Sequence, residues 1–164
     1  MVLKMTELDL IKLAEKAVKK LKDQNKTLAL AESCTGGWVS KLITDVSGAS
    51  AVYQGGVCSY SNEVKMKILG VKEETLNTLG AVSEEVAVQM AEGVRKALGS
   101  DIGIGITGIA GPLSDNTSKP VGLIYVCIAD GNQTTCTELR NNFTKDIRLQ
   151  NRISAAETAL TLLE

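Results

Sequence analysis

The sequence has no histidine among its 164 residues. Within this chain, that absence excludes Ser-His-Asp and Cys-His catalysis, imidazole metal sites and histidine-based pH switches. Aromatic residues are also scarce, with one Trp, three Tyr and one Phe, which disfavours a platform for stacking nucleic-acid bases. The formal net charge of −1 provides no strong positive field to recruit nucleic acid or an anionic membrane. We therefore expect neither as a partner.

Long apolar runs and paired cysteine motifs are missing as well. No run approaches the roughly 18 apolar residues of a membrane-spanning helix, and Glu7 and Asp9 stand where a signal peptide would be apolar. No C-x-x-C spacing occurs, and carboxylates are scattered, so we expect no metal site. We expect a cytoplasmic protein with four reduced cysteines, Cys34, Cys58, Cys127 and Cys136.

The remaining composition is that of an ordinary globular protein, with 44% hydrophobic and 23% charged residues. Surface-area scaling at this length buries about two-thirds of the unfolded chain's surface, which is enough for one core. Neither an internal repeat nor a linker divides the chain. The sequence therefore predicts one domain over residues 1–164.

Hydrophobic periodicity predicts alternating helices and strands. Helices are expected at about 6–22, 38–46, 61–70, 72–78, 83–99 and 146–163, and strands at 27–31, 52–60, 101–107, 121–129 and 134–140. Asp130-Gly131-Asn132 is a hairpin signal between the last two strands. This order predicts a three-layer α/β/α sandwich with a mixed, mostly parallel sheet and an antiparallel hairpin.

Three predicted strands lead directly into polar or glycine-rich turns, at residues 32–37, 60–65 and 107–112. Ligands of parallel sheets bind outside the carboxyl ends of the strands, so we expect these turns to converge.

Ser33 and Lys65 are the candidate catalytic pair. Ser33 lies where a strand meets a helix, and unpaired amides there, such as those of Thr35 and Gly36, can hold an oxyanion. Without histidine, a neutral lysine can serve as the base, which requires its pKa to fall by about 3 units, or about 4 kcal/mol. Tyr60 is close enough in sequence to bond Lys65 or shuttle a proton. The structural alternatives are a helix-capping Ser33 and an exposed helical Lys65.

Cys34 is a rival nucleophile, because a helix start lowers a thiol pKa. More often, a cysteine in such a position is simply a small buried residue.

The turn at 107–112 is suited to an anion, since its glycines let backbone N–H groups approach a phosphate, but a tight structural turn fits equally. Arg148 and Arg152 are alternative phosphate clamps or solvated surface residues.

Five ordered motifs carry a resemblance to a known family. They are AESCTGG (31–37), GGVCSYSNEVK (55–65), GAVSEEVAVQMAEG (80–93), TGIAGP (107–112) and KPVG (119–122). Together they resemble the CinA C-terminal domain family of nicotinamide mononucleotide deamidases, in its standalone form. The resemblance implies a bacterial three-layer enzyme, assembled as a homo-oligomer, that hydrolyses the carboxamide to nicotinic acid mononucleotide and ammonia in pyridine nucleotide recycling.

The resemblance also implies site residues. The catalytic set is Ser33, Tyr60 and Lys65, and the substrate-binding set is Thr35, Gly36, Gly37, Thr107, Gly108, Ala110, Gly111 and Arg148. No cofactor or metal is implied. The loop Leu113–Lys119 departs from the family pattern, which has a glycine pair there, and we expect it to be exposed and mobile. The alternative function is a non-catalytic nucleotide-binding or competence- and damage-associated accessory protein.

Overall fold

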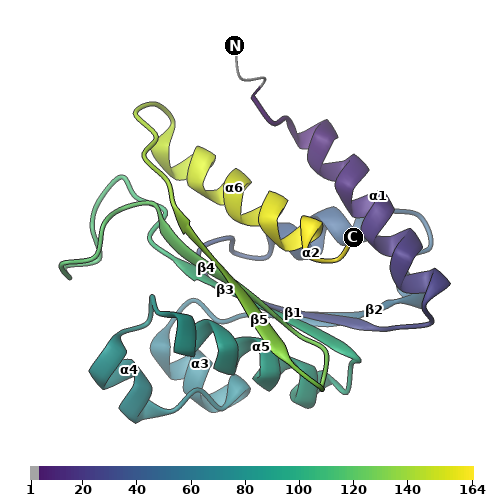
Figure 1. The fold of residues 1–164 in the computed structure, drawn as a ribbon, viewed down its shortest axis with the longest axis horizontal. Helices are drawn as coiled ribbons and strands as arrows, with labels where there is room; N and C mark the ends of the chain where they lie inside the picture. Colours follow the sequence, from purple (N-terminus) through teal and green to yellow (C-terminus); the bar gives the residue numbers. More distant parts are fainter. Residues whose placement is uncertain (1–3) are drawn as a thin grey trace.

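Five strands form one mixed sheet in the order β2-β1-β3-β4-β5, and helices cover both of its faces (Figure 1). The computed structural model describes residues 4–164. The strands are β1 (Leu28–Glu32), β2 (Tyr53–Cys58), β3 (Ile102–Gly108), β4 (Leu123–Ala129) and β5 (Thr134–Arg140). The helices are α1 (Glu7–Asp23), α2 (Trp38–Thr44), α3 (Asn62–Leu69), α4 (Glu73–Leu79), α5 (Glu84–Leu98) and α6 (Ile147–Thr161), with a 3₁₀ turn at Ala49–Ala51.

The strand directions follow from the pairings. β1 pairs in parallel with both β2 and β3, whereas β4 is antiparallel to β3 and to β5. Four strands therefore run the same way, and only β4 runs against them. The predicted three-layer sandwich with a mixed, mostly parallel sheet and an antiparallel hairpin is confirmed.

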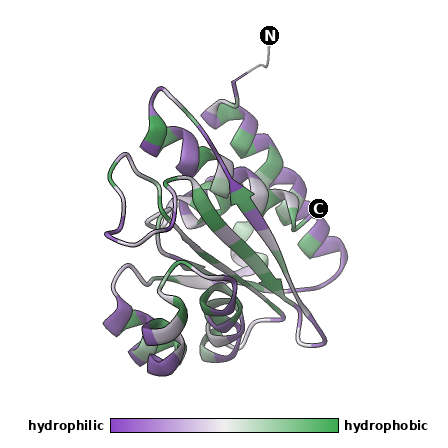
Figure 2. Ribbon diagram, turned by 60° about the vertical axis from the view of Figure 1, so that its left-hand side comes forward, coloured by the Kyte–Doolittle hydropathy of each residue, from purple (hydrophilic) through white to green (hydrophobic). Residues whose placement is uncertain are grey.

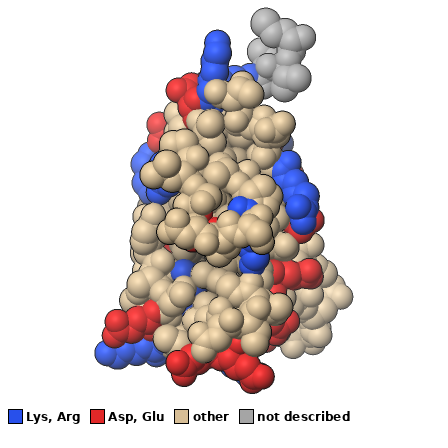
Figure 3. Space-filling view, turned by 90° about the vertical axis from the view of Figure 1, so that its left-hand side faces the viewer, with Lys and Arg blue, Asp and Glu red and all other residues tan. Residues whose placement is uncertain are grey.

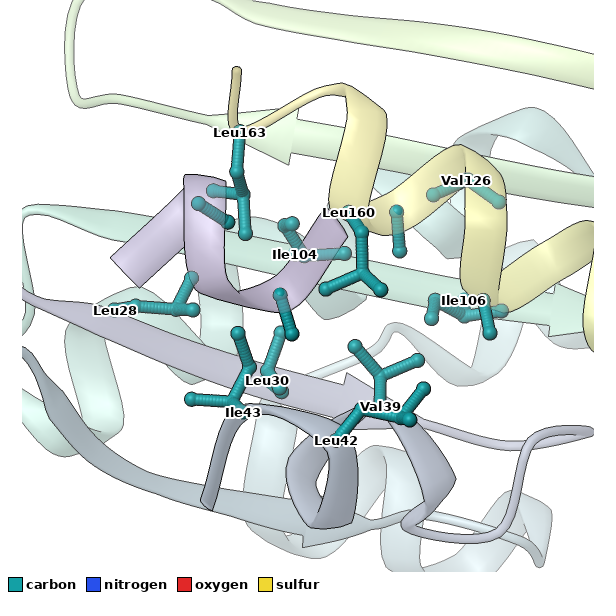
Figure 4. Packing of buried hydrophobic residues seen from close by; sticks show 14 of the residues in the cluster. Leu28, Leu30, Val39, Leu42, Ile43, Ile104, Ile106, Val126, Leu160 and Leu163 are labelled. Atoms are coloured by element: carbon teal, nitrogen blue, oxygen red, sulfur yellow. The ribbon is translucent and has the colours of Figure 1, made fainter. Parts of the chain in front are cut away.

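The two faces of the sheet are packed differently because β3 alternates large and small residues. Ile104 and Ile106 join the main core with α1, α2 and α6 (Figure 4). Figure 2 shows the hydrophobic strands between the two helical layers. On the opposite face, a Cβ at Gly103 or Gly105 would collide with the backbone of α5 at Ala91 or Ala87. The glycines thus allow α5 to lie directly on the sheet.

Local capping explains where the helices begin and end. Thr6 forms a capping box with Asp9 at the start of α1, and the Ser83 hydroxyl accepts the Val86 N–H at the start of α5. Gly70 and Gly99 adopt left-handed conformations after α3 and α5, with φ of 70° and 62°. The observed helix ends lie within about two positions of the predicted ones.

One sequence expectation is wrong: the cysteines are not all reduced. Cys127 and Cys136 face each other across β4 and β5 and form a disulfide, while Cys34 and Cys58 are free. The two residues are nine positions apart with no C-x-x-C motif, so only the register of the hairpin brings their sulfur atoms together.

The topology determines where a ligand can approach. β2, β1 and β3 are adjacent and parallel, so their carboxyl ends lie along one edge of the sheet. The predicted convergence of the turns that follow them is confirmed. Within residues 4–164, no helix is both long enough and apolar enough to cross a bilayer.

Candidate active site

A cavity of about 190 Å³ opens at the carboxyl ends of β1, β2 and β3. Figure 3 looks onto this end of the molecule, where a largely uncharged surface contains a few Lys and Arg atoms. Seven of the predicted site residues line the cavity: Ser33, Tyr60, Lys65, Thr107, Gly108, Ala110 and Arg148. Side chains from four separate stretches of sequence therefore meet in one place.

Ser33 and Lys65 are in direct contact. The Lys65 Nζ lies 3.1 Å from the Ser33 Oγ, and it also lies 2.7 Å from the Ser59 carbonyl oxygen and 3.3 Å from that of Tyr60. Ser33 follows β1 directly, and Lys65 is in the first turn of α3, which starts shortly after β2. The parallel pairing of β1 with β2 places the two side chains together, and the alternative of an exposed helical Lys65 is wrong.

Burial favours the neutral form of Lys65. The residue is only 1% exposed, and this desolvation lowers the pKa of its ammonium from 10.5 to about 8. None of the ion pairs within residues 4–164 involves Lys65. At pH 7.5, about a quarter of the molecules therefore carry a neutral Lys65 amine.

The three neighbours of the Lys65 Nζ determine the direction of its lone pair. The carbonyl oxygens of Ser59 and Tyr60 can only accept hydrogen bonds, so they take the two N–H groups of the neutral amine. Ser33 is the one neighbour with a proton to donate. The lone pair of neutral Lys65 thus faces the Ser33 hydroxyl.

The loop after Ser33 is held from both ends. The buried Glu32 carboxylate accepts the N–H groups of Val39 and Ser40 and the Ser40 hydroxyl, at 2.7 to 3.0 Å. Gly36 donates its N–H to the Ser33 carbonyl at 3.1 Å. Among the described residues, the N–H groups of Cys34 and Thr35 have no acceptor. These two amides are therefore unengaged, and Cys34 lines the cavity, whereas the predicted amide of Gly36 already donates to Ser33.

The Thr35 side chain and the two glycines after it do not line the cavity. Thr35 is completely buried, and Gly36 and Gly37 line a separate groove of about 490 Å³ that also contains Trp38 and Arg152. Their side of the loop faces away from the cavity with Ser33. The structure thus does not bring Gly36 and Gly37 together with the candidate pair Ser33 and Lys65.

Arg148 lies at the cavity without a carboxylate partner. Its guanidinium donates to the Gly111 carbonyl at 2.9 Å and to the Tyr60 hydroxyl at 3.2 Å, and no ion pair involves it within residues 4–164. Next to it, the N–H groups of Ala110 and Gly111 have no backbone acceptor in the described part of the chain. An uncompensated guanidinium and open amides are suited to an anion.

Tyr60 and Thr107 line the cavity, and each also holds a neighbouring group in place. The Tyr60 side chain is 65% exposed, and its hydroxyl contacts Arg148; Lys65 bonds to the backbone carbonyl of Tyr60. The Thr107 hydroxyl donates to the Ala81 carbonyl at 2.8 Å, which ties β3 to the segment before α5. Gly111 does not line the cavity but accepts the Arg148 bond.

Cys34 is unsuited to be the nucleophile. It is 6% exposed, and burial raises the pKa of its thiol to about 12. Although Cys34 lines the cavity, its side chain also belongs to the main hydrophobic core.

Further cavity residues escaped the sequence analysis. Asn62, Ala81, Val82 and Asp115 line the cavity, and the Ser59 carbonyl holds Lys65. Asp115 belongs to the exposed loop 113–119, whose Lys119 ammonium donates to the carbonyls of Leu79 and Val82. The polar residues Ser59 and Asn62, on either side of Tyr60, were the sequence signal that could have identified these positions.

In residues 4–164, no group of three His, Cys, Asp or Glu side chains is arranged to hold a metal.

Comparison with known proteins identifies a family for nearly the whole chain. Residues 10–164 match the model of the CinA C-terminal domain. The chain belongs to this family. It is 52% identical over 143 residues to a CinA-like protein of Syntrophomonas wolfei, covering 87% of this chain and 34% of that one. A CinA-like protein of Thermotoga maritima is 48% identical over 149 residues, covering 89% and 36%. The chain thus spans about a third of the length of these curated relatives.

Solved structures of this family match nearly end to end. A competence/damage inducible protein, CihA, from Agrobacterium tumefaciens has a TM-score of 0.89 at 34% identity and covers 99% of this chain and 97% of its own. A CinA superfamily protein from Escherichia coli has a TM-score of 0.88 at 27% identity and covers 99% and 94%. Both share the overall fold of this chain.

Proposed function

We propose that this CinA-family protein is an amidohydrolase that cleaves the carboxamide of nicotinamide mononucleotide by a serine–lysine mechanism. The observation that carries the proposal is the 3.1 Å contact between the Ser33 Oγ and the buried, largely desolvated Lys65 Nζ. A charged lysine is rarely buried without a carboxylate partner unless its base form is used.

The first half of the reaction forms an acyl-enzyme. Neutral Lys65 takes the proton of the Ser33 hydroxyl while the oxygen bonds to the carboxamide carbon. The negative charge that develops on the carbonyl oxygen is stabilised by the free N–H groups of Cys34 and Thr35. The intermediate then expels ammonia, which takes up a proton as the carbon–nitrogen bond breaks.

Tyr60 is suited to assist that proton delivery. Its hydroxyl accepts a hydrogen bond from Arg148, so its own proton remains available to the departing nitrogen. The proton that Lys65 took from Ser33 replaces the one that Tyr60 gives to ammonia, so both side chains are neutral again when ammonia leaves. In the second half, water attacks the ester while Lys65 takes the water's proton, and Lys65 returns that proton to the Ser33 Oγ as the acid leaves. No metal or organic cofactor is required by these steps.

The phosphate of the substrate is assigned to Arg148 and the turn at 107–111. Support comes from the guanidinium without a carboxylate and from the open amides of Ala110 and Gly111. The pyridinium charge would lie in the cavity near Lys65 and favour the neutral form of that amine.

Ammonia release from nicotinamide mononucleotide tests the proposal directly. Purified wild-type protein should release ammonia, and Ser33→Ala and Lys65→Ala should each lower the rate by about 10³-fold or more while keeping the native circular dichroism spectrum. Lys67→Ala, at an exposed position on the same helix, is the matched control and should keep full activity. Full activity in Ser33→Ala would overturn the mechanism. A wild-type protein that binds the nucleotide without releasing ammonia would favour a non-catalytic binding role.

A further inference from the structure

Arg152 lies on α6 but contacts the loop that follows Ser33. Its Nε donates to the Cys34 carbonyl at 3.2 Å and its Nη2 donates to the Thr35 carbonyl at 3.0 Å. Among residues 4–164 it has no carboxylate partner. Its guanidinium carbon lies 5.3 Å from the centre of the Trp38 ring, which supports the side chain on its other side.

The consequence of these bonds follows from the geometry of the peptide unit. In a trans peptide the C=O and the next N–H point in opposite directions. Because Arg152 draws the Cys34 carbonyl toward α6, the Thr35 N–H of the same peptide points away from α6. That N–H has no acceptor among the described residues.

The second bond acts through one more peptide. Arg152 also holds the Thr35 carbonyl, so the Gly36 N–H points the opposite way, where it donates to the Ser33 carbonyl at 3.1 Å. Holding the Ser33 carbonyl in turn fixes the direction of the Cys34 N–H, which is also without an acceptor in the described chain. One guanidinium therefore sets the orientation of both open amides.

We propose that Arg152 is a positioning residue that holds the Cys34 and Thr35 amides as an oxyanion hole for Ser33. The inference rests on the proposed serine–lysine chemistry. It also separates two arginines one helical turn apart: Arg148 lines the cavity, whereas Arg152 lines the groove on the other side of the loop. Arg152 thus acts through the backbone and does not touch the substrate.

Kinetics of matched arginine variants provide the test. Arg152→Met should lower kcat on nicotinamide mononucleotide by about 30-fold or more, somewhat less than the roughly 10²–10³-fold cost of removing an oxyanion donor outright, and leave KM within about threefold. Arg152→Lys keeps the charge but cannot bridge both carbonyls, so kcat should fall by about tenfold. Arg140→Met removes an arginine that pairs with Glu138 on β5 and should change neither constant. A raised KM with unchanged kcat in Arg152→Met would instead assign Arg152 to substrate binding and overturn the proposal.

Chemical rescue distinguishes positioning from general stabilisation of the fold. Arg152 lines an open groove of about 490 Å³, so guanidinium at millimolar concentration can reach the space left in Arg152→Ala. Guanidinium should restore kcat by about tenfold or more, whereas methylammonium should not, because only guanidinium forms two parallel bonds. Equal effects of the two ions, or none from either, would contradict the proposal.

Covalent labelling of Ser33 does not depend on the proposed substrate, so it tests the role of Arg152 separately from the proposed function. A fluorophosphonate ester forms a bond from phosphorus to the Ser33 Oγ and loses fluoride, while Lys65 takes the serine proton. The phosphoryl oxygen would occupy the oxyanion hole, so labelling measured by mass should slow by about tenfold in Arg152→Met. If the wild type is labelled but releases no ammonia, the proposed substrate fails while slower labelling of the variant still supports Arg152. Equal labelling rates in wild type and Arg152→Met would overturn the positioning role.

Discussion

The Lys65 Nζ lies 3.1 Å from the Ser33 Oγ, although the two residues are 32 positions apart in the chain. The contact exists because β1 and β2 run in parallel and release their chains at the same edge of the sheet. No carboxylate neutralises the lysine among the described residues, so its protonation state responds to burial. Two predictions depend directly on this pair.

The rate of the proposed reaction should rise with pH through the pKa of Lys65. Only the neutral amine accepts the serine proton, and burial lowers its pKa to about 8. We expect kcat/KM to increase about tenfold per pH unit below that value and to level off above it. Steady-state measurements between about pH 6.5 and 9.5 check this. A flat profile, or one that falls through this range, would contradict a lysine base.

Lys65 should also shape how stability depends on pH. Its pKa is about 8 in the folded protein and 10.5 in the unfolded chain, so between these values the unfolded state binds more protons. Below pH 8, the cost of burying the Lys65 ammonium lowers the free energy of unfolding by its full amount. As pH rises from 8 to 10.5 this cost disappears, so the free energy of unfolding increases by at most about 3 kcal/mol.

Lys65→Met removes this contribution. The difference in unfolding free energy between wild type and Lys65→Met should shift in favour of the wild type by up to about 3 kcal/mol between pH 7.5 and 10.5. Urea denaturation at several pH values measures it, with Lys67→Met on the exposed side of α3 as control. A difference that stays constant with pH would show that Lys65 is not desolvated.

Arg148 should act on the phosphate of the substrate. Arg148→Met is expected to raise KM for nicotinamide mononucleotide by about 10- to 100-fold, the effect of losing a charged hydrogen bond. For nicotinamide riboside, which has no phosphate, wild type and variant should have the same KM. Parallel ammonia assays with the two substrates make the comparison. Equal losses on both substrates would place the phosphate elsewhere.

Cys34 should be inert despite its position beside Ser33. Burial raises the pKa of its thiol to about 12, so almost no thiolate exists at neutral pH. Cys34→Ala is expected to keep kcat within about threefold of wild type. In native protein, iodoacetamide should modify the exposed Cys58 and leave Cys34 unmodified, as read by mass spectrometry. An inactive Cys34→Ala that retains its fold would reopen the thiol mechanism.

Local sequence was sufficient to predict the helices and strands. Residues 101–107 were predicted as a strand, and in the structure the isoleucines of β3 face the main core while its glycines face α5. Thr6, Ser83 and Gly99 mark helix ends through bonds within a few residues of themselves. Such features need no distant partner, so a pattern of neighbours is enough to predict them.

The candidate site was predictable only in part. Ser33 and Lys65 followed from the absence of histidine and from the motifs around them. In contrast, Gly36 and Gly37 were expected at the substrate but line the opposite side of their loop. The reason is the direction of successive peptide planes, which depends on Glu32 and Arg152 holding the loop from two sides.

By itself, the sequence determined the chemistry available to this protein. With no histidine, it left lysine as the side-chain base for Ser33, and its order of helices and strands specified a sheet covered on both faces. Tertiary structure alone decided which groups meet. Parallel pairing brought Lys65 to Ser33, hairpin register joined Cys127 to Cys136, and one turn of α6 directed Arg148 to the cavity and Arg152 to the loop. These outcomes depend on strand register and helix rotation, and both are set by packing between segments far apart in the chain.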